Sequence, residues 1–421
     1  NTIGTYNAFF GYRTGRYNTE GDWNAFFGFQ AGYNNTTGEN NSFFGPNSGF
    51  YNTTGQNNSF LGYYSGMGNY TGSDNTYIGY KAGYSGGFTS DASGSDNVFI
   101  GVNAGENNLI GHDNIGIGNL AGNSNTSGNY NVYIGTNAGK SNQTADYNTM
   151  IGYLAGENTI EGFNTMVGYM AGQTNTSGDC QALFGYRAGW QNTGSRNTLI
   201  GTEAGYSSGA GAYNVYVGIA AGRECTGDNN VFLGKYAGYG GGTSSNKLII
   251  ENNYTLSDNA NNALIYGEFD TDKLRFNANV GIGRAPSSNY GLYVDGGTLY
   301  EMRVVGDAHA SGTFYSDSDI RLKKNINNYK NALDKILQIR GVSFEWRRKE
   351  FPETDYDEGI RIGVIAQEVE KVFPELVSND GEYKSVAYSK LSAVLVEAIK
   401  EQQKMIGELQ ERIAVLEEKN E

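Results

Sequence analysis

The sequence NAFFGFQAG at residues 24–32 is followed by NSFFGPNSG at residues 41–49 and by NSFLGYYSG at residues 58–66. All three fit one pattern, Asn-x-x-apolar-Gly-x-x-small-Gly, which recurs along residues 7–238. Successive units are 16 or 17 residues apart, except for one step of 22 residues. A short fixed period of this kind indicates a repeat architecture with one structural unit per repeat. The first glycine of the pattern falls at fourteen positions, which are Gly11, Gly28, Gly45, Gly62, Gly79, Gly101, Gly118, Gly135, Gly152, Gly168, Gly185, Gly201, Gly218 and Gly234.

Several positions of the repeat predict a structural role. The residue before the first glycine is apolar in every unit, as in Phe10, Phe27 and Phe44, which predicts a column of side chains facing the interior. The residue before the second glycine is Ala, Ser or Thr, as expected where backbones approach closely. Four residues before the first glycine stands Asn in thirteen units and Gln181 in the other, so stacked carboxamides are expected to form a ladder from coil to coil. The N-T-T-G and N-T-S-G segments between units have the composition of turns.

These features predict a mainly β protein with a β-roll or β-solenoid over residues 1–242, in which each repeat forms one coil. At ~4.8 Å per strand layer, fourteen coils would form a rod of roughly 67 Å. The expected inner column holds about one or two apolar side chains per coil, so a single chain would bury little. We therefore expect a homotrimer in which the chains share one core.

The composition argues against several functional classes. A net charge of −14 makes nucleic acid and anionic membranes poor partners. No apolar run reaches about 18 residues, so membrane insertion is not expected. The two cysteines, Cys180 and Cys225, are too few for a disulfide framework. A calcium-binding β-roll would need an aspartate in each coil, and none recurs, so we expect neither a metal ion nor another cofactor.

After Gly242 the repeats stop, and residues 243–317 are expected to form a β-structured trimeric shaft. Its candidate strands are Lys247–Glu251, Ala263–Phe269, Leu274–Phe276, Val280–Ile282 and Leu292–Val294.

The composition changes again at residue 318, where charged residues become frequent and glycine becomes scarce. We expect a folded α+β domain over residues 318–390, with helices and strands in alternation. Residues 391–421 are expected to form a coiled-coil helix, because apolar residues recur there at alternating steps of four and three. The candidate helices are Tyr329–Ile339 and Ala366–Phe373, and the candidate strands are Gly341–Arg347 and Ile360–Ile365.

The heptad seam of the last helix does not by itself favour a trimer. Ile at a and mostly Leu at d favour two strands, whereas the polar Gln402 at a d position could set the register or the oligomeric state. We retain the trimer because the rest of the chain favours it. The seam consists of Leu395, Ile399, Gln402, Ile406, Leu409, Ile413 and Leu416.

Two resemblances add to this interpretation. The repeats resemble the β-roll heads of trimeric autotransporter adhesins and of phage fibres. The sequence SDIRLKKNI at residues 318–326 resembles the start of the intramolecular chaperone domain of endosialidase tailspikes. IGVIAQEV at residues 362–369, FPELV at residues 373–377 and SVAYSKL at residues 385–391 are similar to further motifs of that family. The second resemblance covers about residues 316–421, a quarter of the chain.

The second resemblance implies that the chain trimerises through this domain and then cleaves itself once. Carried over by motif, the nucleophile is Ser318, the base is Lys323 and the scissile bond joins Asp317 to Ser318. Asp319 and Arg321 belong to the same motif, and an orienting role is expected for them. No multi-turnover activity is expected. Spacing alone, without the resemblance, is better explained by a helix cap at Ser318-Asp319 and a solvated charge at Lys323.

Together the resemblances imply a phage tail fibre or tailspike that attaches to a receptor or glycan on a target cell. The chain begins inside the repeats, so the part that would join it to a virion baseplate is expected to precede Asn1. The alternative is a secreted or surface-displayed bacterial adhesin with the same chaperone domain. The expected location is therefore the virion tail or the cell surface. A glycan-degrading spike is disfavoured, because residues 1–242 contain no recurring pair of carboxylates.

Overall fold

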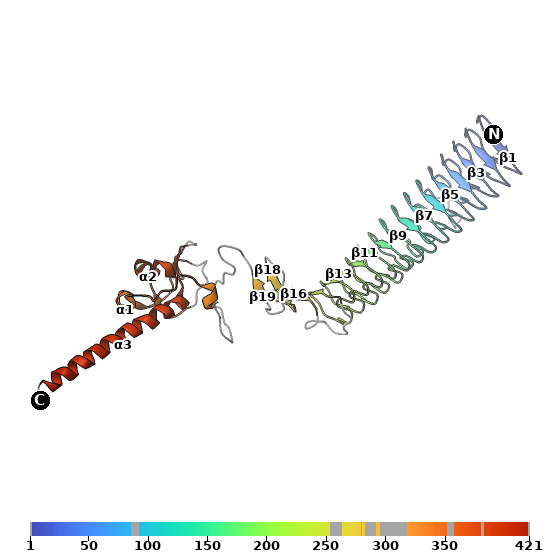
Figure 1. Ribbon diagram of the computed structural model, residues 1–421. Coiled ribbons are helices and arrows are strands. Elements are labelled where there is room, and N and C mark those ends of the chain that lie inside the picture. The colour runs from blue at the N-terminus through green and yellow to red at the C-terminus, as the bar shows by residue number, and fades with distance from the viewer. Residues whose placement is uncertain are drawn as a thin grey trace. The chain divides into compact units, whose positions relative to one another are not determined.

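The computed structural model describes residues 2–85, 92–252, 263–278, 280–282, 292–294, 318–351, 358–379 and 383–419. The chain forms two compact units, Asn1–Tyr293 and Val294–Glu421. The first unit is a β-solenoid, and the second contains three α-helices and short strands (Figure 1).

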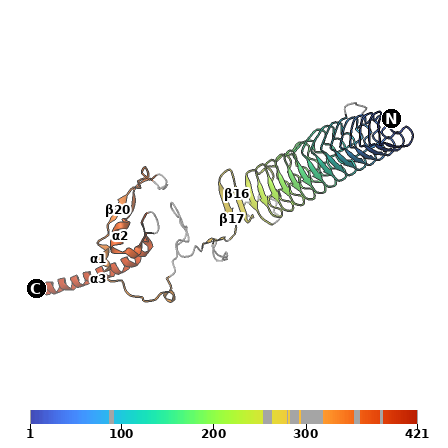
Figure 2. The ribbon, with the colours of Figure 1, turned by 90° about the horizontal axis from the view of Figure 1, so that it is seen from above.

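The solenoid contains fourteen strands of three residues, one for each repeat of the sequence. Neighbouring strands are parallel and pair in register, for example Phe26 with Phe43 and Phe43 with Phe60. The predicted fold, one coil per repeat, is therefore confirmed. Figure 2 shows the coils stacked along the axis of this unit. The strands are β1 Ala8–Phe10, β2 Ala25–Phe27, β3 Ser42–Phe44, β4 Ser59–Leu61, β5 Thr76–Ile78, β6 Val98–Ile100, β7 Ile115–Ile117, β8 Val132–Ile134, β9 Thr149–Ile151, β10 Thr165–Val167, β11 Ala182–Phe184, β12 Thr198–Ile200, β13 Val215–Val217 and β14 Val231–Leu233.

The interior column is made by the middle residue of each strand. Phe26, Phe43 and Phe60 are buried, and their rings stack with centroids 4.7 and 4.8 Å apart. The sequence analysis placed the following residue, as in Phe27 and Phe44, in the interior, and this was wrong. Side chains alternate along a strand, so with the middle residue inside, both of its neighbours point outward.

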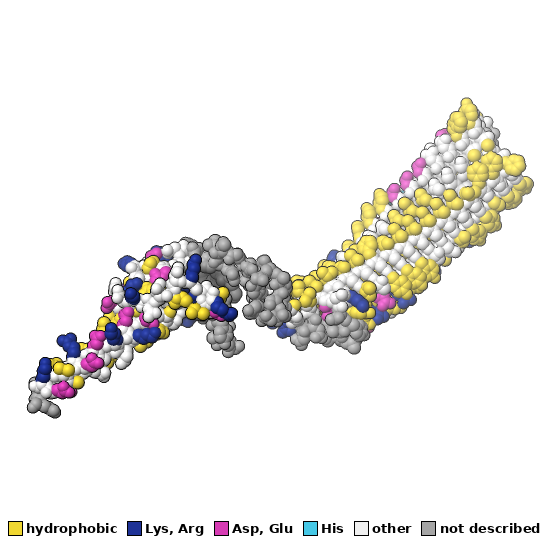
Figure 3. Space-filling view, viewed as in Figure 1, with side chains coloured by type: hydrophobic (Ala, Val, Ile, Leu, Met, Phe, Trp, Pro, Cys, Tyr) yellow, Lys and Arg dark blue, Asp and Glu magenta, His cyan; other side chains and the backbone are white. Residues whose placement is uncertain are grey.

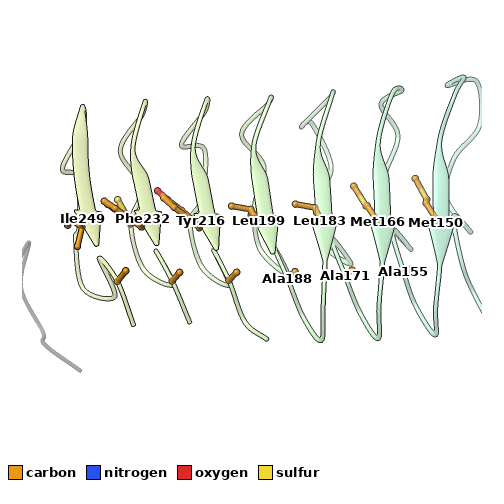
Figure 4. Close-up of a cluster of buried hydrophobic side chains, with 14 of the residues drawn as sticks. Met150, Ala155, Met166, Ala171, Leu183, Ala188, Leu199, Tyr216, Phe232 and Ile249 are labelled. Atoms are coloured by element: carbon orange, nitrogen blue, oxygen red, sulfur yellow. The ribbon is translucent and has the colours of Figure 1, made fainter. Parts of the chain in front are cut away.

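The solenoid core lies within one chain. Opposite the strands runs a second buried column of small residues, of which Ala155, Ala171 and Ala188 face Met150, Met166 and Leu183 (Figure 4). These middle residues and alanines are fully buried without any partner chain. The expectation that several chains must share this core is therefore wrong, and a trimer needs a different physical reason.

Two asparagine ladders run parallel to the core. In the first, the Asn41 N–H donates to Asn24 Oδ1 over 3.0 Å, and Asn41 Nδ2 donates to the Gly55 carbonyl over 2.8 Å. The predicted ladder is thus confirmed: side chains bond to backbone groups along it, and carboxamides also bond to each other, as where Asn75 Nδ2 donates to Asn58 Oδ1 over 3.2 Å. The second ladder lies in the N-T-[ST]-G turns, where Asn35 Nδ2 donates to Asn18 Oδ1 over 2.6 Å. The sequence analysis assigned those segments to turns and missed this ladder.

The first glycine of each repeat is required by a close backbone approach. Gly45 has φ +135°, and a Cβ built on it would lie 2.5 Å from the carbonyl oxygen of Gly62 in the next coil. Neither the backbone conformation nor the space allows a larger residue.

The sheet continues past the repeats. Strand β15 Lys247–Ile250 pairs in parallel with β14, and β16 Ile265–Glu268 and β17 Lys273–Phe276 follow as antiparallel strands. A separate two-stranded sheet is formed by β18 Val280–Ile282 and β19 Leu292–Val294. Strands were thus correctly expected in all five places. Residues 253–262, 279, 283–291 and 295–317 of the expected shaft lie outside the described residues.

The second unit contains the elements that the sequence predicted, with shorter bounds in most cases. From residue 318 on, the first element is the short 3₁₀ turn η1 and the last is the long helix α3. Its elements are η1 Ile320–Leu322, α1 Ala332–Ile336, β20 Gly341–Phe344, β21 Arg361–Val364, α2 Ala366–Val372, η3 Pro374–Leu376, β22 Val377–Ser378, β23 Ser385–Val386 and α3 Tyr388–Glu418.

The first ladder yields a stability prediction. Replacing Asn41 with Ala removes the oxygen that accepts the Asn58 N–H over 2.9 Å and leaves that buried donor unpaired. We expect a loss of about 1–3 kcal/mol in unfolding free energy, measured by urea denaturation. Thr37→Ala, at an exposed turn position of the same coil, is the control and should change the midpoint little. Equal effects of the two variants would contradict the role of the ladder.

A glycine pair tests the close approach. Gly45→Ala should lower the thermal unfolding temperature of the solenoid, because its Cβ would collide with the next coil. Gly407→Ala is the matched control in α3, where a Cβ meets no atom within 4 Å. It should raise helix stability by about 1 kcal/mol, since Ala is the better helix former. A tolerated Gly45→Ala would show that the coils can separate at this point.

Candidate functional site

The second unit has a small core of its own. Ala332 of α1, Val369 of α2 and Val394 and Ala398 of α3 pack together with Phe373. A side chain of α3 also caps α1: Glu401 Oε1 accepts the Ala332 N–H over 3.1 Å, and Glu401 Oε2 accepts the Leu333 N–H over 2.8 Å. The N–H groups of a first helical turn lack partners within the helix, so this carboxylate ties the two helices together. The hydrogen bond from the Leu333 N–H lowers the pKa of Glu401. Burial acts in the opposite direction, but the pKa remains below its usual value.

The segment that carries the predicted site residues begins with Ser318. Asp319 is the N-cap of η1, and its side chain accepts the Arg321 N–H over 2.8 Å. The Arg321 guanidinium also donates to both oxygens of Asp319, over 3.0 and 3.1 Å from Nε and 2.6 Å from Nη2. These bonds from Arg321 lower the pKa of Asp319. The two side chains thus pair with each other at the turn.

The turn brings Ser318 and Lys323 together. Lys323 is the C-cap of η1, and its Nζ lies 2.6 Å from Ser318 Oγ. A single 3₁₀ turn reverses the direction of the chain over three residues, so the residues at its two ends can meet. A hydroxyl within hydrogen-bond distance of an amine is the arrangement that an activated serine nucleophile needs.

The pair is exposed in the isolated chain. Ser318 and Lys323 lie on the surface, and the intervening Ile320 and Leu322 are 71% and 72% exposed. A lysine amine acts as a base near neutral pH only when burial disfavours its charged form. The geometry for nucleophilic attack is therefore present, whereas the dry surroundings that it requires are not supplied by this unit alone. Asp317, on the other side of the expected scissile bond, lies outside the described residues.

Other kinds of site receive no support from the part of the chain that the structure describes. There, no group of three or more His, Cys, Asp or Glu residues is placed to hold a metal ion. Within the same residues, none of the helices combines the length and the apolar character needed to cross a bilayer. Of the two cysteines, Cys225 is buried and Cys180 is exposed, and both are free.

The Glu401 cap was missed by the sequence analysis. Glu401 is separated by 69 residues from Ala332, and no short motif connects them. The available signal was spacing: Glu401 lies seven residues after Val394 and three after Ala398, so it shares the helix face of these two core residues. That signal does not identify the N–H donors.

The C-terminal unit contains a domain similar to the chaperones of endosialidases: residues 318–378 match the protein family described as "Chaperone of endosialidase". Together with the β-solenoid, this domain fits a phage tail fibre that ends in a chaperone. Such proteins are among the relatives of the chain. It is 34% identical over 163 residues to the long tail fiber protein Gp37 of Salmonella phage S16, covering 37% of this chain and 20% of the relative.

Two further relatives show how far the similarity reaches. The chain is 27% identical over 161 residues to the long tail fiber protein Gp37 of Enterobacteria phage T2, covering 36% of this chain and 11% of the relative. It is 25% identical over 191 residues to myelin regulatory factor homolog 1 of Caenorhabditis elegans, covering 39% of this chain and 20% of that protein. The matches thus span about a fifth or less of these curated relatives. The two phage relatives support a structural tail fibre and are consistent with a virion tail location.

The helix cap gives a pH-dependent prediction. A carboxylate whose pKa is lowered by folding contributes stability above its unfolded pKa, and this contribution is lost as the pH falls through the folded value. Glu401→Gln should therefore destabilise the C-terminal unit at pH 7, and the difference from wild type should shrink at pH 3. The measurement is thermal unfolding followed by circular dichroism at the helix signal. Glu411→Gln, exposed farther along α3, is the control, and an equal effect at both positions would contradict the cap.

Proposed function

We propose that this chain is the receptor-binding part of a homotrimeric tail fibre, and that its C-terminal domain directs trimer formation and then cleaves itself off. The phage tail fibre relatives favour this proposal over the bacterial adhesin. The proposed partner on the particle side is a virion baseplate. The receptor would be a protein or glycan on the target cell.

Attachment is supported by the surface chemistry of the solenoid. Exposed aromatic side chains form ladders, such as Tyr130–Tyr147–Phe163, whose ring centroids are 5.1 Å apart at each step. Because each ring covers the face of the next, the ladder presents mainly ring edges and hydroxyl groups to solvent. A sugar that stacks on an aromatic face would find such a face only at the end of a ladder. Recognition along the ladder would depend on edge contacts and hydrogen bonds.

Self-cleavage rests on the 2.6 Å contact between Lys323 Nζ and Ser318 Oγ. With the amine neutral, Nζ accepts the hydroxyl proton while Oγ attacks the carbonyl carbon of Asp317. The bond between that carbon and the Ser318 nitrogen then breaks, and the nitrogen receives the proton from Lys323. The acyl group is left as an ester on Oγ, and water hydrolyses the ester to the Asp317 carboxylate and the free hydroxyl.

The exposed setting of the pair explains why cleavage would follow assembly. Apolar surface from a neighbouring copy, covering Ile320 and Leu322, would exclude water from Lys323 and favour its neutral form. A chain that had not assembled would remain intact. One turnover per chain is enough, so a slow reaction suffices.

Substitutions of Ser318 and of two neighbouring lysines distinguish self-cleavage from a purely structural role of the pair. We expect Ser318→Ala and Lys323→Arg to abolish cleavage, because Ala has no nucleophile and Arg cannot act as a base. Lys324→Arg, a charge-conserving change at the neighbouring lysine, is the matched control and should cleave normally. Denaturing gels and intact-mass spectrometry would detect a fragment spanning 318–421. Cleavage that persists in Ser318→Ala, or intact wild-type chains in assembled trimers, would exclude self-cleavage at this bond.

A further inference from the structure

An outward-facing surface runs the length of the solenoid. We call it the outer sheet face, and it consists of the first and third residues of strands β1–β14, which flank the buried middle residue. We propose that three copies of the chain pack side by side through their outer sheet faces, with equal coils at equal height. This inference rests on the homotrimer proposed above and assigns the surface that joins its copies.

The outer sheet face is apolar at every level. Its third residues are Phe, Leu, Ile or Val in all fourteen strands, and its first residues are Ala, Ser, Thr, Val or Ile. None of these positions holds a charge, although the chain carries 74 charged side chains in total, 30 basic and 44 acidic. The position just after the first glycine also points outward but is mixed, since it includes Asn119, Thr202 and Lys235. Covering the outer sheet face would therefore desolvate no charge.

This face is open to solvent in the single chain. Phe27 is 38% exposed, Leu61 52% and Ile200 40%, and apolar side chains gather in stripes along the solenoid (Figure 3). Parallel sheets normally have both faces covered. Here the solenoid interior covers one face only. A face about 10 Å wide and about 67 Å long offers on the order of 700 Å² per copy in total, which its two neighbours in a trimer would share.

The side-chain volumes indicate that the partner is another copy. Where the third residue is Phe, the first residue is Ala or Ser, as in Ala25 with Phe27 and Ser42 with Phe44. Where the third residue is Ile or Val, the first is Thr, Val or Ile, as in Thr76 with Ile78. Around a three-fold axis, the third residue of one copy meets the first residue of the next at the same height. The Phe coils then place a large residue against a small one, and the Ile and Val coils place residues of more similar size against each other, which keeps the interface filled.

The C-terminal helix gives an independent reason for a second copy. In α3 the seam residues Leu409, Ile413 and Leu416 are 56%, 52% and 60% exposed. A seam with heptad spacing buries its apolar residues against parallel helices of the same kind. The chain thus carries two long apolar surfaces at regular spacing, one in each unit, and further copies of the chain would match both.

Cross-linking at single cysteines tests the assigned face. The background is Ser318→Ala, which keeps the chain whole, with Cys180→Ser, which removes the exposed native thiol. Leu61→Cys and Ile134→Cys place a thiol on the outer sheet face. Thr71→Cys and Thr144→Cys place one on exposed turns of the corresponding coils and serve as controls. Each variant is treated with a short bismaleimide, and denaturing gels score covalent dimers, the largest product that one accessible thiol per chain allows, while light scattering gives the native mass.

We expect at least a tenfold higher cross-linked fraction for Leu61→Cys and Ile134→Cys than for the turn controls, in particles with three times the 45.6 kDa chain mass. Two separate sites, checked by unchanged circular dichroism, protect the result against misfolding of one variant. A trimer that cross-links at the turns, or at none of the four sites, would overturn the assigned face and leave the trimer standing. A single-chain mass would overturn the trimer as well.

Discussion

The distance between neighbouring strands of a β-sheet, ~4.8 Å, governs most of the solenoid. Stacked aromatic rings need nearly the same separation, and the rings of Phe43 and Phe60 lie 4.8 Å apart. A carboxamide spans one coil to the next at this spacing, which lets Asn41 bond to Asn24. The first glycines also follow from it, because a side chain at Gly45 would occupy the space of the Gly62 carbonyl. A repeat that fits this spacing once can be stacked many times.

The sequence predicted the architecture of the solenoid but not the direction of its side chains. Period, glycine positions and asparagine columns together determine one coil per repeat. The pattern has two adjacent apolar residues, such as Phe26 and Phe27, and periodicity alone does not say which one points inward. In the structure Phe26 is buried and Phe27 is exposed. The error mattered, because it led to the expectation of a core shared between chains. The structure instead has a core within one chain and an apolar face on the outside.

The C-terminal domain shows a similar division. Helices and strands were recognisable from local spacing, and the distance between Ser318 and Lys323 follows from a single turn. The long-range contact of Glu401 with α1 could not be predicted from the sequence, since the two partners are far apart along the chain. The bonds between Asp319 and Arg321 were also not predicted from the sequence, and the structure shows that the two side chains pair with each other at the turn.

The regularity of the outer sheet face carries a risk for assembly. If one copy were displaced along the axis by a single coil, Ile134 would meet the surroundings of Ile117 or Ile151, which differ little from its own. The aligned and staggered arrangements would then differ little in contact energy. Staggered copies would also leave apolar face uncovered at their ends, where further chains could bind. A device that aligns three chains at one end, before their long sides meet, removes this ambiguity. Once the sides have closed along their whole length, no copy can slide without breaking every contact together, and the aligning device can be discarded.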